Sequence, residues 1–267
     1  MPPALAEQLG VTVVPANVVI DDVNYRDGID LTADEFYQRL VAGPRLPTTS
    51  QPSVGTFQAA YQEILEQGDE IVSIHVSSKL SGTVNSAEQA KASLGDSVPI
   101  EVVDSHSASI AVTLKVLGAV DAARQSSSHR EVADEVRRDL SRTTAVFALD
   151  TLEYLQKGGR VGKAQAFVGS LLSVKPILTL VDGEVHPLER PRNHQRAMRR
   201  LIELTREKGQ PVRLGVIYST EQEWATEIRS SLSDLLPEEE IVTARFGPAL
   251  GTYVGPRAVG VALTVAE

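Results

Sequence analysis

The sequence predicts an α/β protein with two domains, and two observations carry this prediction. In the first half of the chain, short apolar or β-branched segments alternate with longer segments of helical periodicity. This alternation is typical of parallel βαβ units with right-handed crossovers. Beyond about residue 142 a hairpin and separate helices replace the alternation, which favours a mixed or antiparallel sheet. We therefore expect domains over residues 1–142 and 143–267, packed closely because no Gly/Ser linker separates them.

In the first half, polar or proline-rich loops are expected over residues 21–31 and 43–52. Thr32 with Glu35, and Ser128 with Glu131, have the spacing of capping boxes. The expected strands cover residues 11–20, 70–76 and 99–104, and the expected helices cover residues 32–41, 53–67, 85–94, 108–123 and 128–140.

In the second half, the Asp182-Gly183 pair between two apolar segments is a strong hairpin signal. The glycine-rich stretch over residues 247–260 is either a tight loop or a backbone that approaches a ligand closely, and both interpretations stay open. The expected strands cover residues 144–149, 176–180, 185–189, 212–218, 241–246 and 258–265; the expected helices cover residues 152–157 and 193–208 and a segment with Trp224, Ile228 and Leu235 on one face.

Composition excludes several classes of protein. The chain of 267 residues has 42% hydrophobic and 23% charged residues, which is ordinary for a globular protein. A net charge of −9 argues against a nucleic-acid partner, which needs an excess of clustered Lys and Arg. The absence of cysteine rules out disulfides and thiolate metal sites. No signal peptide and no apolar run of membrane-spanning length is evident, so we expect a cytoplasmic protein without an integral membrane segment.

Two hydroxyl-rich runs, PTTSQPS over residues 47–53 and SSKLSGT over residues 77–83, precede predicted helices. Helix starts leave N–H groups unpaired, so the two runs could form an anion cradle at the carboxyl edge of the sheet. The simpler interpretation is that each run supplies only caps and turns, as Ser53 does for the helix that follows it. His75 lies inside a predicted strand, and we interpret it as a packed histidine.

Motifs for catalysis are absent from the sequence. GGRVGK over residues 158–163 differs from a P-loop, because Lys157 stands where glycine is needed and Ala164 where Ser or Thr is needed. There is no GxSxG elbow and no HExxH or similar zinc spacing. We therefore expect no catalytic residue and no metal site.

Six strings stand in one order over nearly the whole chain: TTSQPS, SSKLSGT, VVDSHSAS, LEYLQKGGRV, SVKPIL and GPxxGxxxGPxxxG. Together they resemble the DegV family. The resemblance implies two α/β domains that hold one long-chain fatty acid between them, with no other cofactor. Many members serve as the binding subunit of a bacterial fatty acid kinase, whose kinase subunit phosphorylates the bound carboxylate with ATP to give acyl phosphate for phospholipid synthesis. The resemblance thus implies a binding protein with a kinase partner rather than an enzyme.

The resemblance also assigns site residues. Thr49 and Ser81 should hydrogen-bond the fatty-acid carboxylate, and Arg190 should supply positive charge beside it, because its guanidinium can hold a carboxylate or phosphate at two points. Without the resemblance, we would place Arg190 in a solvated loop beside a basic helix. The other candidates for the carboxylate site are Ser50, Gly82, Thr83 and Tyr253, and the secondary candidates are Ser53, Arg192, Gly255 and Arg257.

The sequence departs from the family pattern at three places. Tyr253 stands where the family usually has histidine; it can donate a hydrogen bond to a carboxylate but is neutral at pH 7. Arg257 stands where glycine is common. The chain begins after the family's first strand and DS-type turn, so we expect the N-terminal domain to lack that strand.

Two other functions remain open. One is a lipid sensor or storage protein without a kinase partner. The other is a stand-alone phosphotransferase or hydrolase that uses Thr49 or Ser81, although the missing P-loop, elbow and base count against it. The apolar residues expected to line a tunnel, or simply to form core, are Ala108, Ile110, Ala111, Leu114, Phe167, Leu171 and Leu172.

Overall fold

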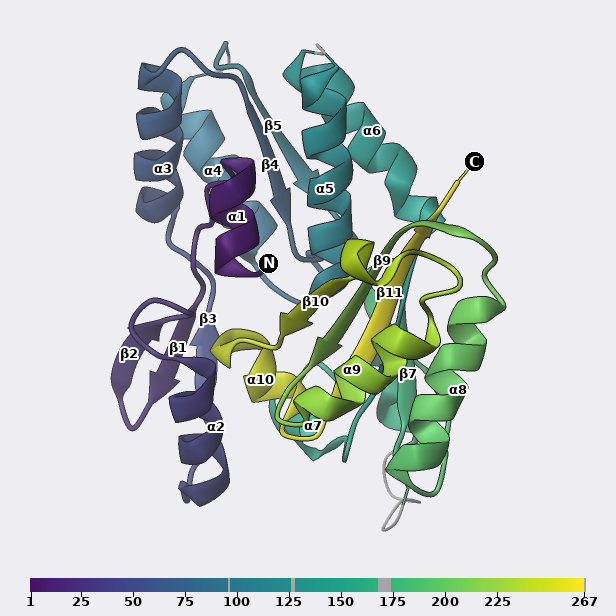
Figure 1. The fold of residues 1–267 in the computed structure, drawn as a ribbon. Helices are drawn as coiled ribbons and strands as arrows, with labels where there is room; N and C mark the ends of the chain where they lie inside the picture. Colours follow the sequence, from purple (N-terminus) through teal and green to yellow (C-terminus); the bar gives the residue numbers. More distant parts are fainter. Residues whose placement is uncertain (96, 126–127, 168–173, 267) are drawn as a thin grey trace.

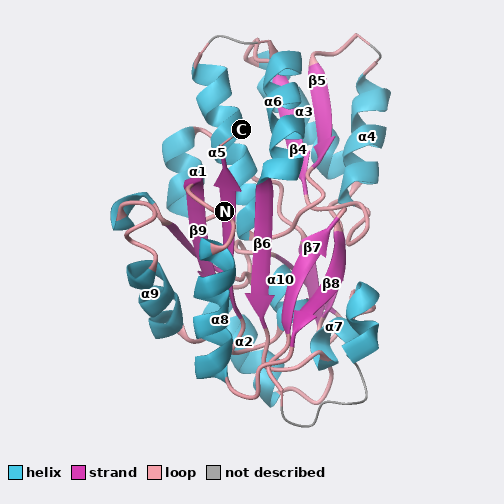
Figure 2. Ribbon diagram, turned by 90° about the vertical axis from the view of Figure 1, so that its right-hand side faces the viewer, coloured by secondary structure: helices cyan, strands magenta, loops and turns pink. Residues whose placement is uncertain are grey.

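The computed structural model describes residues 1–95, 97–125, 128–167 and 174–266, and within them the chain forms three sheets (Figures 1 and 2). The first sheet is antiparallel with strand order β2-β1-β3, the second is a parallel pair of β4 and β5, and the third has the order β10-β9-β11-β6-β7-β8. The third sheet is mixed, because β10 and β9 are parallel and its other pairs are antiparallel. The strands are β1 (Asn17–Ile20), β2 (Val23–Arg26), β3 (Thr48–Ser50), β4 (Ile71–His75), β5 (Ile100–Asp104), β6 (Thr143–Ala148), β7 (Ile177–Val181), β8 (Glu184–Glu189), β9 (Pro211–Tyr218), β10 (Val242–Arg245) and β11 (Val259–Val265).

The helices cover these sheets. The α-helices are α1 (Pro3–Leu9), α2 (Ala33–Ala42), α3 (Val54–Glu66), α4 (Thr83–Leu94), α5 (Ile110–Arg124), α6 (His129–Arg142), α7 (Glu153–Lys157), α8 (His194–Arg206), α9 (Gln222–Ser231) and α10 (Pro248–Val254), and the 3₁₀ helices are η1 (Gly162–Phe167) and η2 (Glu238–Glu240). No helix in the described part of the chain is both long and apolar enough to cross a membrane.

Helix α5 belongs to two layers of the molecule. Its residues Ile110 and Leu114 are fully buried in a core cluster that also holds side chains of the six-stranded sheet, such as Leu178. Its residue Ala119 lies in a second cluster with Val103 of β5 and with α6. Helices α3 and α4 pack on the opposite face of the β4–β5 pair, and α8 and α9 cover the other face of the large sheet. The position of one sheet relative to the other therefore depends on α5.

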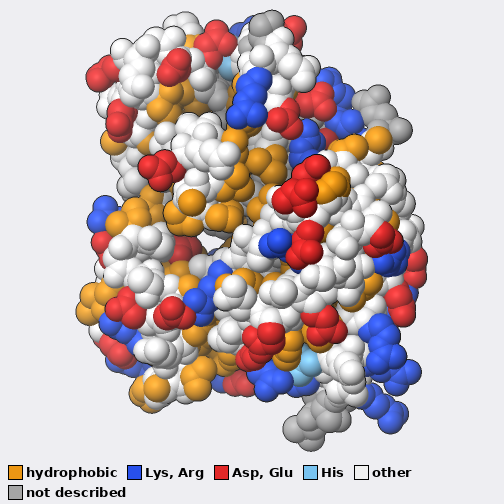
Figure 3. All heavy atoms as spheres, in the orientation of Figure 1, with side chains coloured by type: hydrophobic (Ala, Val, Ile, Leu, Met, Phe, Trp, Pro, Cys, Tyr) orange, Lys and Arg blue, Asp and Glu red, His pale blue; other side chains and the backbone are white. Residues whose placement is uncertain are grey.

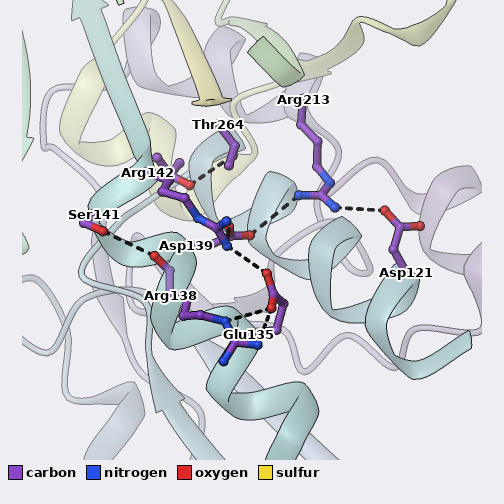
Figure 4. Close-up of polar contacts among 9 residues, drawn as sticks. Asp121, Glu135, Arg138, Asp139, Ser141, Arg142, Arg213 and Thr264 are labelled. Carbon is purple, nitrogen blue, oxygen red and sulfur yellow. Dashed lines mark hydrogen bonds and ion pairs between the residues drawn. The ribbon is translucent and has the colours of Figure 1, made fainter. Parts of the chain in front are cut away.

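A partly buried ionic network joins α5 and α6 to β9 (Figure 4). The Arg213 guanidinium donates to Asp121 at 3.0 Å and lies 3.6 Å from Asp139, and Figure 4 shows these side chains pointing toward one another. Arg142 lies 2.8 Å from Asp139 and 2.7 Å from Glu135. Burial raises the pKa of Asp139, and the two guanidinium groups oppose that shift. Because removing one partner would leave a buried charge uncompensated, this network resists separation of the α5–α6 hairpin from the large sheet.

The α/β fold class is confirmed, with a parallel strand pair followed by a mixed sheet. The predicted capping boxes at Thr32 and Ser128 are present, and the predicted hairpin joins β7 to β8. The boundary predicted near residue 143 falls between α6 and β6, while the core cluster around α5 contains residues from both sides of it. The division into residues 1–142 and 143–267 stays a prediction.

The structure differs locally from the sequence-based expectations. Only Asn17–Ile20 of the predicted 11–20 strand is a strand, and it pairs antiparallel with β2 and β3, two strands inside segments expected to be loops. The tight-loop interpretation of residues 247–260 was wrong, because this stretch contains α10, which begins at Pro248 after Gly247; the alternative of a close approach to a ligand stays a prediction. Residues 3–9 form α1, which the sequence did not predict; Pro3 starts it and Gly10, with φ +66°, ends it.

The free edge of β4 borders a groove lined by both apolar and polar side chains. Among the described strands β4 pairs only with β5, and the groove beside its other edge has a volume of about 670 Å³. Side chains from α3, α5 and α6 line it, including Phe57, Val112 and Val132. Figure 3 shows hydrophobic side chains gathered in a hollow of this face of the molecule. His75 also lines the groove; it is packed edge-on against Phe57 and bonded to Ser73 Oγ at 2.8 Å, which confirms its interpretation as a packed histidine.

A substitution at Gly183, in the turn between β7 and β8, tests the contact between the β7–β8 hairpin and the loop after β4. Its φ is +80°, and a Cβ at this position would lie 2.1 Å from Ser77 Oγ. We expect Gly183→Ala to lower the free energy of unfolding by roughly 2–3 kcal/mol, because the clash adds to the strain of a left-handed alanine. Urea denaturation measures this loss. Gly209→Ala is the matched control, because its φ is +91° and no atom lies within 4 Å of the added carbon; equal losses in both variants would contradict the contact.

His75 predicts a pH dependence of stability. Burial lowers the pKa of His75 to about 4, from an ordinary value near 6.5. Between pH 4 and pH 6.5 the unfolded chain therefore binds the additional proton, so the free energy of unfolding rises with pH across this window and falls on acidification. We expect His75→Leu to reduce this pH dependence, so that the free energy of unfolding changes by on the order of 3 kcal/mol less between pH 4 and pH 6.5. Urea titrations at several pH values measure this difference. A variant whose stability keeps the wild-type slope between pH 4 and 6.5 would show that another group is responsible.

Candidate functional site

A second cavity, of about 270 Å³, lies among the first sheet, the β4–α4 loop, α10 and the six-stranded sheet. This volume is just below the range of small-molecule pockets, roughly 300–1,000 Å³. Most of its wall is apolar, and the larger apolar side chains are Phe147, Leu149, Leu178, Leu180, Val185, Phe246 and Leu250. The polar lining residues are Asp27, Thr49, Ser50, Gln51, Ser81, Thr83, Arg160, Thr179 and Tyr253, with Ser109 at the start of α5.

Thr49 and Tyr253 meet from opposite ends of the chain. Thr49 lies on β3, whose pairing with Val18 of β1 fixes its position, and Tyr253 lies on the last turn of α10. Their hydroxyl oxygens are 2.5 Å apart, and either can donate. Because each hydroxyl also has acceptor lone pairs, the pair can turn a donor toward a ligand oxygen without moving its heavy atoms.

Ser81 reaches the cavity from the loop between β4 and α4. Its Oγ accepts the backbone N–H of Thr83 at 3.3 Å and lies 2.8 Å from Thr83 Oγ1. Gly82, between them, has no side chain and lies close to Gln51: a Cβ there would lie 2.8 Å from the Gln51 amide nitrogen. Glycine at this position therefore allows the second hydroxyl run to close against the end of the first.

Arg160 is the one cation that lines the cavity among the described residues. Its Nε donates to the carbonyl of Leu80 at 3.1 Å, and Nη1 donates to the carbonyl of Gly158 at 2.7 Å. Its guanidinium carbon lies 5.0 Å from the centre of the Tyr253 ring. Gly158 permits this arrangement, because a Cβ there would lie 2.5 Å from the same ring. The contacts hold a positive charge beside the hydroxyls, next to an otherwise apolar wall.

This arrangement suits a ligand with an anionic head and an apolar body. Hydroxyl donors and one guanidinium can replace the water that a carboxylate loses on burial, which otherwise makes burial costly. The apolar wall would bury a hydrocarbon chain. Among the described residues, no group of three or more His, Asp or Glu side chains could hold a metal ion.

The structure brings together five of the residues that the sequence analysis assigned to the carboxylate site: Thr49, Ser50, Ser81, Thr83 and Tyr253 line this cavity. Gly82 lies beside it without lining it. Ser53 instead caps α3, accepting the N–H of Thr56 at 3.1 Å.

The three predicted arginines lie outside the cavity. Arg190 and Arg192 line a separate depression of about 630 Å³ with the basic face of α8, and the Arg190 guanidinium lies 4.5 Å above the Phe167 ring. Figure 3 shows Lys and Arg side chains gathered on the lower right of the molecule, where α8 lies. The exposed Arg257 instead packs 5.3 Å from the Trp224 ring.

Gly255 does not line the cavity, and only some of the predicted tunnel residues do. Gly255 is buried just after α10 with φ +70°, and a Cβ there would meet the Tyr154 ring at 2.3 Å, so the position shapes the chain without lining the cavity. Of the apolar candidates, Ala108 lines the cavity, and Ile110, Ala111 and Leu114 are core residues. Leu171 and Leu172 lie outside the described residues.

Sequence reasoning missed Arg160, Gln51 and Asp27. Arg160 stands in the LEYLQKGGRV string, after two glycines that end a helix, and this glycine-glycine-arginine run was the available signal. Gln51 lies inside the first hydroxyl run. Asp27 carried no signal, because its side chain accepts the N–H of Ala249, which lies more than two hundred positions away in the sequence.

Comparison with known proteins gives one consistent result. A family model described as "Uncharacterised protein, DegV family" matches residues 1–265. Protein DegV of Bacillus subtilis is 36% identical over 265 residues, which cover 98% of this chain and 94% of that protein.

Solved structures agree with this match. A structure described as showing fatty acid binding of a DegV family protein from Thermus thermophilus has a TM-score of 0.92 at 36% identity, covering 99% of this chain and 96% of that one. A stearic acid-binding protein from Eubacterium ventriosum has a TM-score of 0.90 at 26% identity, covering 99% and 94%. Because the family model spans nearly the whole sequence and a curated relative is more than a third identical over the same length, the chain belongs to the DegV family.

Proposed function

We propose that this protein binds one long-chain fatty acid, with the carboxylate held by Thr49, Ser81, Tyr253 and Arg160. The observation that carries the proposal is the line of contacts from Arg160 through Tyr253 to Thr49 in a cavity whose remaining wall is mostly apolar. Fatty acid binding described for relatives from Thermus thermophilus and Eubacterium ventriosum supports the same ligand class.

The energetics favour an acyl chain over a small polar ligand. Burying roughly fifteen methylene groups at about 0.8 kcal/mol each contributes on the order of 12 kcal/mol before the costs of association and ordering. The head group then needs only to replace its lost hydration, which the hydroxyls and one arginine can do.

The proposal extends to a partner. In the cytoplasm, the bound carboxylate would be presented to a kinase subunit for phosphorylation to acyl phosphate, as the family resemblance implies. The basic depression that contains Arg192, Arg196 and Arg199 is a surface that could receive an acidic patch of such a partner, because it stands out on a chain with a net charge of −9.

The alternatives are weaker. Among the described residues, the hydroxyls of Thr49 and Ser81 bond other hydroxyls and no histidine or carboxylate, so neither has the adjacent base that a nucleophile needs. A sensor or storage protein would use the same cavity without the kinase, and only a partner assay separates it from the proposed carrier.

The carboxylate cradle predicts a stoichiometric lipid. We expect native mass spectrometry, followed by solvent extraction, to find about one fatty acid per chain, because one cavity holds one head-group site. Thr49→Ala combined with Ser81→Ala should lose the lipid, since two hydrogen bonds to a charged group disappear. Ser53→Ala is the control, because this hydroxyl only caps α3. Lipid-free wild-type protein, refractory to loading with oleate, would overturn the proposed function.

Substitutions of Arg160 and Arg190 should differ in their effect on fatty-acid binding. We expect Arg160→Gln to weaken binding of a fluorescent polyene fatty acid by about 10- to 100-fold, because a charged hydrogen bond contributes roughly 1.5–3 kcal/mol. Arg190→Gln should leave this affinity within about twofold, because Arg190 does not line the cavity. The measurement is fluorescence titration of each variant. A large loss in Arg190→Gln with little change in Arg160→Gln would move the head-group site to the α8 face.

A further inference from the structure

Asp27 lies at the point where the first sheet meets α10. It follows β2, and its backbone N–H donates to the carbonyl of Ala16 at 2.9 Å, which continues the β1–β2 pairing by one residue. Its side chain lines the cavity. Its Oδ2 accepts the backbone N–H of Ala249, in the first turn of α10, at 3.3 Å.

Helix α10 has no cap of its own. Gly247 occupies the N-cap position, and no side-chain cap bond is formed by that residue. A Cβ at Gly247 would lie 2.7 Å from Asp27 Oδ1. The Asp27 carboxylate thus occupies the space beside the helix start where a capping side chain would lie, and it satisfies one of the N–H groups that every helix start leaves unpaired.

The same helix holds Tyr253 at its other end. Ala249 and Tyr253 are four residues apart, so they share one face of α10, and both line the cavity. Tyr253 bonds Thr49 on β3. Because β2 and β3 flank β1 in one sheet, α10 is attached to both sides of that sheet, by Asp27 just after β2 at the helix start and by Thr49 of β3 at the helix end.

We propose that Asp27 is a positioning residue for the fatty-acid head group: by holding the first turn of α10, it keeps the Tyr253 hydroxyl beside Thr49 and the Tyr253 ring against Arg160. This inference rests on the proposed function. Burial raises the pKa of Asp27, opposed by the Ala249 N–H and by the α-amino group of Met1, so the charged side chain is costly where it lies. The contacts of this carboxylate with Ala249 and beside Gly247 are the observations that assign it to the orientation of α10.

The test combines substitutions at Asp27 with one at Tyr253. In the full chain, Asp27→Ala should weaken binding of the fluorescent polyene fatty acid about five- to tenfold, the size expected for the loss of a cap. Asp27→Asn keeps an acceptor and should stay within about twofold. In a Tyr253→Phe background, Asp27→Ala should have less than about a twofold further effect, because the two residues act through the same hydroxyl.

A ligand-independent measurement keeps the inference separate from the proposed function. Hydrogen exchange of residues 248–254 in lipid-free protein should quicken about tenfold in Asp27→Ala. Asp30→Ala is the matched control, because Asp30 pairs with Arg26 in the same segment. If wild type fails to bind fatty acid while exchange still responds to Asp27, the proposed function fails and the anchoring of α10 survives. Unchanged exchange, or additive losses in Asp27→Ala and Tyr253→Phe, would overturn the inference.

Discussion

The packing of α5 between two sheets is the constraint on which the rest of the structure depends. Ile110 and Leu114 lie in one apolar cluster with the six-stranded sheet, and Ala119 lies in another with β5 and α6. Close approach is possible because Gly215 of β9 has no side chain; a Cβ there would lie 2.5 Å from Ile110 Cγ1. Apolar burial is non-directional, so contacts of fixed geometry are needed to set the orientation.

Two contacts of fixed geometry lie outside the cavity. The Arg213 network ties the far end of α5 to β9, and the Gly183 turn lies against Ser77 in the loop that carries Ser81. Within this frame the hydroxyls of Thr49 and Tyr253, 204 positions apart in the chain, meet at hydrogen-bond distance. In this fold the polar end of the site is assembled from β3, the β4–α4 loop and α10, which lie far apart in the sequence.

Features encoded by neighbouring residues were predictable from the sequence. The capping boxes at Thr32 and Ser128 and the turn at Asp182-Gly183 depend on spacings of a few positions. Features that depend on distant partners were not predictable in this way. Thr48–Ser50 is a strand only because β1 lies beside it, and Arg160 and Arg190 cannot be ranked without knowing which loop faces the cavity. The family resemblance pointed to the hydroxyls of Thr49 and Ser81, which line the cavity. It also pointed to Arg190, the arginine after the hairpin, which does not line the cavity.

The shared position of α5 has a consequence for recombination between relatives. A chimeric protein joined at residue 143 would place the α5 of one parent against the large sheet of another, and every mismatch at Ile110 or Leu114 would fall in a fully buried layer. A crossover in the loop before Ile110 would keep α5 with its own large sheet, but it would divide the cluster that Ala119 shares with β5. Neither of these two crossovers leaves both faces of α5 matched, because the two faces pack against segments that lie on opposite sides of the helix in the sequence.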